Sequence, residues 1–232
     1  MRVGAAALAG GIFGGLGTLC FLLAFGTDYW LLASDNCVPV TTVVTSAPPS
    51  LTLHHEGFFW RCVFQAEPTA HVIVATLFTN QPESKVCIHG YLFPLPVVIG
   101  QVPHPIYDTT AVFRGFWTLL IILGVVAALA GGFLLLCGVP FSSHKLYRVG
   151  GAFLIASGMT CLILLVVLLY VLWMELVDVK RYILQERGET CPDAQVSVLY
   201  GWSFMVAAAG VPLQLLSGML FMLGGYVLHA RK

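Results

Sequence analysis

The sequence predicts a membrane all-α four-helix bundle with an extracellular antiparallel β-sheet. The chain has 232 residues, of which 58% are hydrophobic and only 9% are charged, and its mean hydropathy is +0.89. A soluble domain cannot bury so much apolar surface, which favours a membrane protein. Four windows of about twenty or more residues contain no charge, the length that a membrane-spanning helix requires. The windows are residues 3–26, 115–138, 149–174 and 200–228.

These windows organise the chain as one domain, residues 1–232. The first window is too long for a signal peptide and has no basic segment before it beyond Arg2, so we expect a retained span. Two loops, residues 27–113 and 175–199, then lie on one side of the membrane, and a short link, residues 139–148, lies on the other. The helical pattern of the third span continues to about Glu186, beyond the membrane.

The distribution of charge predicts the orientation. All eleven acidic residues fall in the two loops, whereas the termini and the short link carry basic residues without an acid beside them. Basic segments remain on the cytoplasmic side, so we expect a multi-pass protein of the plasma membrane with both termini in the cytoplasm. The basic residues on that side are Arg2, Lys145, Arg148, Arg231 and Lys232. Aromatic residues near the span ends, among them Trp30, Trp117, Tyr147 and Tyr226, are expected at the membrane interfaces.

Glycines in the first span predict close helix packing. Gly10 and Gly14 are four residues apart, as are Gly11 and Gly15, and we expect them on one helical face that another backbone can approach. The partner is either a helix of this bundle or a second copy of the chain in a homo-oligomer.

The first loop contains three strand-like segments, at residues 29–32, 51–65 and 84–93, with a Thr- and Pro-rich excursion at 38–50. We expect them to form an antiparallel sheet that part of the second loop completes. Alternation along a strand places Phe58 and Trp60 on one face and Phe59 and Arg61 on the other.

The pattern of polar residues argues against a pump, a transporter or an enzyme. The central parts of the spans contain no charged residue or histidine, which ion and proton pathways normally require. Gln214 is expected to make one hydrogen bond between helices. In a strand, only His54 and Glu56 of the segment His54-His55-Glu56 share a face, too few ligands for zinc. We therefore expect no catalytic residue, metal, cofactor or nucleic-acid partner.

Seven cysteines fall into two groups. Four lie in the outer loops, where an even number in an oxidising compartment predicts two disulfides with three pairings open. These are Cys37, Cys62, Cys87 and Cys191. The others, in or beside the spans, are expected to be reduced packing residues, and Cys137 is placed where S-acylation can occur. These are Cys20, Cys137 and Cys161.

Several of these residues resemble the signature of the claudin superfamily, which is Trp, then Gly-Leu-Trp, then two cysteines. Trp30 takes the first place, Gly57-Phe58-Phe59-Trp60 the second with one extra aromatic, and Cys62 and Cys87 the last two. More residues separate the two cysteines than in claudins. Gly201 and Trp202 resemble the start of the last claudin span, and Arg114 the family's arginine at the second span. The resemblance covers essentially the whole chain.

The resemblance implies a claudin-like fold with a Cys62–Cys87 disulfide, which leaves Cys37 and Cys191 to join the two loops. It also implies that Arg114 packs near the loop tryptophan. The face with Trp60 and the disulfide should then pack on the bundle, and Phe59 and Arg61 should point outward to bind a partner. The alternative places Phe59 on lipid or on residues 38–50.

The function implied by the resemblance is that of a non-enzymatic tetraspan, surrounded by membrane lipids, that binds a receptor or adhesion protein laterally. One branch of the superfamily implies an integrin partner and restraint of muscle-cell differentiation and fusion. The alternative is a claudin-type cell–cell junction protein that forms a paracellular barrier or pore. Claudins mostly end in a PDZ-binding Tyr-Val, so the ending His229-Ala230-Arg231-Lys232 leads us to expect no scaffold-tethered junction.

Overall fold

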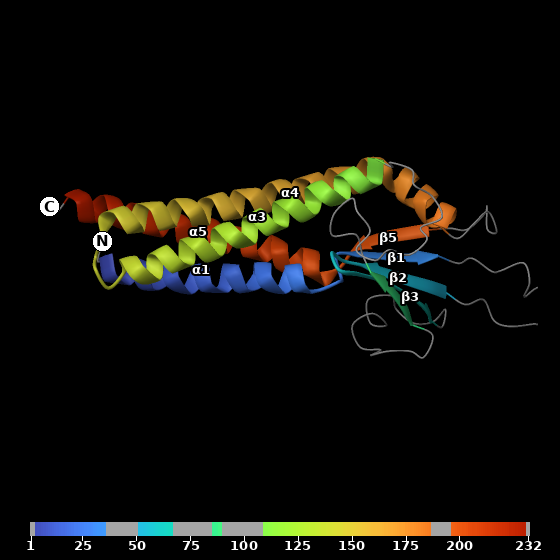
Figure 1. Cartoon of the computed structure of the whole chain (residues 1–232), viewed down its shortest axis with the longest axis horizontal. Coiled ribbons are helices and arrows are strands. Elements are labelled where there is room, and N and C mark those ends of the chain that lie inside the picture. The colour runs from blue at the N-terminus through green and yellow to red at the C-terminus, as the bar shows by residue number, and fades with distance from the viewer. Residues whose placement is uncertain (1–2, 36–50, 67–84, 90–108, 187–195, 231–232) are drawn as a thin grey trace, which may run out of the picture.

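The structure, a computed structural model, describes residues 3–35, 51–66, 85–89, 109–186 and 196–230. Within these residues, four long helices lie side by side and a small sheet projects from one end of the bundle (Figure 1). The described ends of the chain lie at the opposite end of the bundle (Figure 1). The helices are α1 (Val3–Gly26), α3 (Thr109–Gly138), α4 (His144–Glu186) and α5 (Trp202–Ala230).

Each helix contains a stretch that is long and apolar enough to cross a membrane. These stretches are Gly4–Gly26, Phe116–Gly138, His144–Val167 and Trp202–Ala230. The helix α4 ends at Glu186, as the sequence predicted. Pro212 lies inside α5, which nevertheless continues as one helix from end to end.

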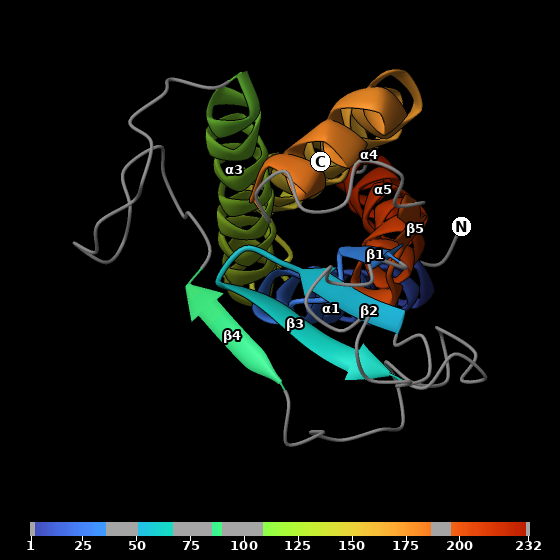
Figure 2. The ribbon, with the colours of Figure 1, turned by 90° about the vertical axis from the view of Figure 1, so that its right-hand side faces the viewer.

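Some glycines of α1 lie close to a neighbouring helix of the bundle. Seen from the sheet end, the helices follow one another as α1, α5, α4 and α3 (Figure 2). A Cβ at Gly10 would lie 2.9 Å from the ring of Phe221, and one at Gly14 would lie 2.6 Å from the Ser217 hydroxyl. A Cβ at Gly11 would meet nothing within 4 Å.

A Cβ at Gly15 would also meet nothing within 4 Å, so the expectation that all four glycines share one packing face is wrong. The reason is helical geometry, because adjacent positions point about 100° apart at 3.6 residues per turn. Gly10 and Gly14 therefore pack against α5, whereas Gly11 and Gly15 lie on the outer surface of α1.

Buried polar side chains link the helices by hydrogen bonds. The hydroxyl of Ser217 donates to the carbonyl of Gly10 at 2.6 Å, and that of Ser157 donates to the carbonyl of Gly124 at 2.6 Å. The Gln214 amide nitrogen donates to the Thr18 hydroxyl at 3.2 Å, which is the predicted bond between helices. These bonds satisfy the two serine hydroxyls and the Gln214 amide nitrogen, which would otherwise be costly to bury, whereas Oε1 of Gln214 has no hydrogen-bond partner among the described residues.

The sheet has five antiparallel strands in the order β4-β3-β2-β1-β5. The strand β5 comes from the second loop and pairs with β1, so the second loop completes the sheet as predicted. The predicted single strand over residues 51–65 is instead a hairpin, with a bend at residues 57–59. The strands are β1 (Leu31–Asp35), β2 (Leu51–Glu56), β3 (Trp60–Ala66), β4 (Val86–His89) and β5 (Val196–Tyr200).

The main core lies where the sheet meets the bundle. It contains Phe21 of α1, Trp117 of α3, and Trp30 and Phe58 from the segments beside the strands. A smaller cluster at the other end contains Tyr147. The rings of Trp30, Trp117 and Tyr147, which the sequence placed near span ends, are buried inside the protein and do not face the lipid headgroups.

Candidate functional site at the junction of sheet and bundle

Trp30 is the centre of the junction. Its side chain is completely buried, and its ring lies edge-on to Phe58 at 5.1 Å and to Trp117 at 5.5 Å between centroids. The indole N–H donates to the carbonyl of Ala24, in the last turn of α1, at 2.7 Å. Trp30 therefore fixes the start of β1 against both α1 and α3.

The segment before β1 also docks on the start of α5. The N–H of Tyr29 donates to the Ser203 hydroxyl, and the N–H of Ser203 donates to the carbonyl of Tyr29, both at 3.2 Å. The N–H of Gly201 donates to the carbonyl of Trp30 at 2.9 Å. A Cβ at Gly201 would overlap the Tyr29 carbonyl, and the Trp202 ring stacks on Tyr29. Gly201 and Trp202 of the family signature therefore have a structural role.

The bend of the β2–β3 hairpin rests on Asp28. The N–H of Gly57 donates to the carbonyl of Trp60 at 3.0 Å and closes the bend. A Cβ at Gly57 would overlap the backbone of Asp28, so only glycine permits this approach. The N–H of Trp60 donates to the Asp28 carboxylate at 3.3 Å.

Two ionisable groups are partly or fully removed from water at this point. Burial raises the pKa of the Asp28 carboxyl, against the opposing effect of the hydrogen bonds from the backbone of Trp60 and Phe59 and of the charge of Lys85. Burial also lowers the pKa of His55, although its hydrogen bond with the Asp28 backbone acts in the opposite direction. Burial therefore makes the charged form of Asp28 costlier than in water, and it favours the neutral form of His55 at neutral pH.

The geometry around His55 fixes its tautomer. The imidazole stacks on the ring of Tyr29 at 4.4 Å, and Nδ1 lies 2.9 Å from the carbonyl oxygen of Asp28. A carbonyl only accepts hydrogen bonds, so Nδ1 carries the proton. The other nitrogen, Nε2, is buried without a hydrogen-bond partner among the described residues. Protonation would place a charge there, which the site does not compensate.

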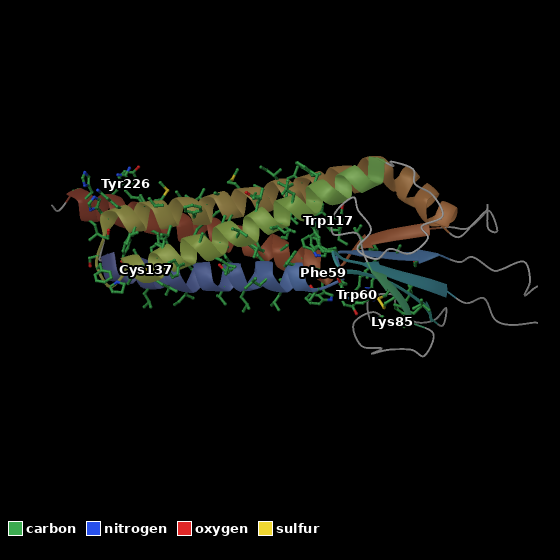
Figure 3. All side chains as sticks on the ribbon, in the orientation of Figure 1. Phe59, Trp60, Lys85, Trp117, Cys137 and Tyr226 are labelled. Atoms are coloured by element: carbon green, nitrogen blue, oxygen red, sulfur yellow. A yellow bond between two sulfur atoms is a disulfide. The ribbon has the colours of Figure 1, made fainter. Side chains whose placement is uncertain are left out.

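The prediction that Phe58 faces inward is confirmed, but the predicted faces of Phe59 and Trp60 are wrong. Phe58 is buried and Phe59 is half-buried, with its ring against Phe25 at 5.2 Å. Trp60, predicted to point inward, is 38% exposed. The reason is the bend at residues 57–59, because the alternation of a strand does not continue through a turn. Figure 3 shows Phe59 near the end of the bundle and Trp60 and Lys85 farther out along the sheet.

A second match to the signature fits this geometry. Counted from Gly57, Phe58 and Phe59 take the places of Leu and Trp in Gly-Leu-Trp, and both pack on the core. Trp60 is then the extra aromatic, at the first position of β3. The outward role predicted for Phe59 does not hold, and the side chains of Arg61 and Arg114 lie outside the part that the structure describes.

A disulfide joins β3 to β4. Cys62 and Cys87 are directly paired across the two strands, with an S–S distance of 2.03 Å. This is the pairing that the resemblance implied, whereas Cys37 and Cys191 lie outside the described residues. On β4, the outermost strand, Cys87 is exposed and the residue before it, Val86, is 64% exposed. We call Trp60, Val86 and Cys87 the β3–β4 edge.

The remaining predicted residues do not assemble a reactive site. In the described ranges, no three His, Cys, Asp or Glu residues come close enough to hold a metal ion. Cys20 and Cys137 are half-buried free thiols, and Cys161 is a buried one. Sequence reasoning missed Asp28, His55 and Ser203 as structural residues of the junction. A serine at the start of an otherwise apolar span was the available signal for Ser203.

Four membrane-length helices, a sheet contributed by both loops on one side, and a buried signature tryptophan at their junction define a claudin-type tetraspan. The chain belongs to the family described as PMP-22/EMP/MP20/Claudin tight junction, which it matches over residues 15–223. Within the family it is similar to Transmembrane protein 182. It is 46% identical to the Mus musculus protein over 230 residues, which cover 97% of each chain. The Homo sapiens protein is 45% identical over 231 residues, also 97% of each chain, and the Danio rerio protein is 39% identical over 246 residues, 99% of this chain and 98% of the relative.

Proposed function

We propose that this chain is a non-enzymatic tetraspan of the plasma membrane that binds an adhesion receptor laterally, with an integrin as the partner. By this contact it restrains muscle-cell differentiation and fusion. The proposal is supported by the similarity to Transmembrane protein 182 along nearly the whole chain, together with the partner class that this resemblance implies. The basic residues at one end of the bundle support the proposed orientation, which has both termini in the cytoplasm and the sheet outside.

The observation that carries the proposal is the β3–β4 edge. Trp30 and Phe58 are buried inside the protein, but Trp60 keeps more than a third of its surface exposed. Exposed tryptophans are over-represented among the residues that dominate binding energy. The disulfide next to Trp60 holds the strand pair before a partner arrives, which lowers the entropic cost of binding.

Trp60→Ala tests this assignment, with Leu199→Ala as its matched control. Leu199 is also an exposed apolar residue, 47% accessible, but it lies on β5 at the opposite edge of the sheet. Each variant is expressed in muscle precursor cells and purified in mild detergent, and the integrin that co-purifies is quantified by immunoblot at matched surface expression. We expect Trp60→Ala to lose most of the integrin and Leu199→Ala to retain it. An equal result for the two variants would contradict the role of the edge.

The second candidate function is a claudin-type junction, which the family match itself favours. Freeze-fracture of transfected fibroblasts separates the two candidates. Strand networks between contacting cells would support a junction protein, and their absence, together with a co-purifying integrin, would support the lateral regulator.

A further inference from the structure

A second arrangement of polar groups lies at the end of the bundle away from the sheet, where α4 begins and α5 ends. The rings of His144 and His229 face each other across the two helices at 5.0 Å. One turn farther into the bundle, the Arg148 guanidinium lies 4.5 Å above the ring of Tyr226. An Arg148 N–H also donates to the Tyr226 hydroxyl at 3.4 Å. Figure 3 shows Tyr226 at this end.

The backbone is shaped to bring these groups together. A Cβ at Gly225 would lie 2.7 Å from Cγ of Arg148 and 3.1 Å from the carbonyl of His144, so glycine is required for α5 to approach α4 here. The stacked ring holds Arg148 in place, which reduces the entropy that it loses on binding a ligand. Lys145, one residue after His144, is exposed. We call His144, Lys145, Arg148, Tyr226 and His229 the basic seam.

The two permanent cations of the basic seam, Lys145 and Arg148, have no acidic counterpart in the described segments around them. The sequence contains no Asp or Glu before residue 28, between residues 109 and 174, or after residue 193. The described residues at this end come from those segments alone, so none of them offers a side-chain carboxylate to Arg148 or Lys145. A cationic cluster without acids is electrostatically complementary to an anion, and arginine binds phosphate through two parallel hydrogen bonds.

The depth of the seam indicates which phosphate it meets. His144 and Arg148 are four residues apart on α4, which is about 6 Å along a helix. The headgroup layer of a bilayer is roughly 5–7 Å thick on each side of the hydrocarbon. Both residues belong to the membrane-length stretch of α4, and strongly exposed apolar residues lie nearby on the α3 end and the link, Leu136 at 76% and Phe141 at 80%. A lipid can therefore place its phosphate on the seam and its chains beside the helices.

We propose that the basic seam is a binding site for the headgroup of an anionic phospholipid. Arg148 is the principal phosphate contact, and Lys145 adds a second positive charge beside the two histidine rings. The site lies at the other end of the bundle from the β3–β4 edge, so it is separate from the proposed receptor contact. It is the kind of site that anionic lipids of the cytoplasmic leaflet can fill.

The test uses the purified full-length protein in phosphatidylcholine nanodiscs to which phosphatidylinositol bisphosphate is added, with lipid binding followed by titration. A basic residue near an anionic surface contributes about 1 kcal/mol, so Arg148→Gln should weaken binding about fivefold. Adding Lys145→Gln should weaken it by about the same factor again. Tyr226→Leu, which removes the platform but no charge, should also weaken binding. Lys85→Gln, the same change of charge at the sheet end, should leave it unchanged.

Thermal unfolding of each variant verifies that the bundle is intact. Tyr226→Phe, which keeps the stacked ring, is the control for Tyr226→Leu. Binding of Arg148→Gln equal to that of the unchanged protein would overturn the proposal, as would an equal loss in Lys85→Gln. Competition with inorganic phosphate or inositol phosphate in solution shows whether the site binds a lipid headgroup or a free phosphate. Displacement of the lipid by the soluble anion at comparable concentration would contradict a lipid site, and failure to displace it would support one.

Discussion

Replacing Trp30 by phenylalanine removes the indole N–H and part of the ring from a fully buried position. The hydrogen bond to Ala24 is lost, which costs about 1–1.5 kcal/mol because the carbonyl stays buried. The smaller ring leaves a cavity between Phe58 and Trp117, at a cost of about 1 kcal/mol. We therefore expect Trp30→Phe to lower the free energy of unfolding by about 2 kcal/mol, and Trp30→Ala by about 5 kcal/mol or more.

The measurement is reversible unfolding of the purified protein in mixed micelles, followed by tryptophan fluorescence and circular dichroism. Trp60→Phe is the matched control, since the same change at a 38% exposed position should alter the free energy of unfolding by less than about 0.5 kcal/mol. If Trp30→Phe and Trp60→Phe were equally stable, the reasoning that Trp30 fixes the sheet to the bundle would be refuted.

Three further changes test the junction and the strand pair. Gly57→Ala should reduce folding and delivery to the cell surface, because the new Cβ would overlap Asp28. Gly11→Ala should have little effect, because a Cβ at that position meets nothing within 4 Å. Surface biotinylation measures the amount of each variant at the cell surface. Cys87→Ser should lower the free energy of unfolding by about 3–4 kcal/mol, since the bridge closes a loop of 25 residues. Non-reducing peptide mapping that pairs Cys62 with another cysteine would contradict this disulfide. Since the folded state lowers the pKa of His55, its stabilising contribution is complete above about pH 6.5 and is lost as the pH falls through the folded pKa. The free energy of unfolding should therefore decrease from about pH 7.5 to about pH 5, the range that contains the histidine pKa. The decrease should be smaller in His55→Phe. Identical pH profiles for the two proteins would exclude this histidine as the cause.

The spans and the sheet could be predicted because each depends on a long, repeated property of the sequence. A charge-free window must be long enough to cross the hydrocarbon, and strand-like segments in the first loop must pair with something. The second loop contributed β5 because β1 would otherwise have an unpaired edge. The Cys62–Cys87 pairing was reached only through the family resemblance, since four cysteines alone left three pairings open.

The faces of Phe59 and Trp60 could not be predicted from alternation. A shift of one residue moves every side chain of a strand to the other face, and the hairpin bend introduces such a break. At the bend, Gly57 contacts Asp28, and this contact brings together two segments that are far apart in the sequence. The role of His55 has the same origin, because its hydrogen bond and its stacking partner both come from the segment before β1.

The central claim, that the outer edge of the sheet contacts an integrin laterally, is tested most directly by site-specific cross-linking in muscle precursor cells. A photo-reactive phenylalanine is introduced at Trp60 and, in a separate variant, at Leu199 on the opposite edge. Cross-linked complexes are isolated after irradiation and probed for integrin subunits. The account predicts an integrin adduct from position 60 and none from position 199. No adduct from position 60, or equal adducts from both positions, would contradict it.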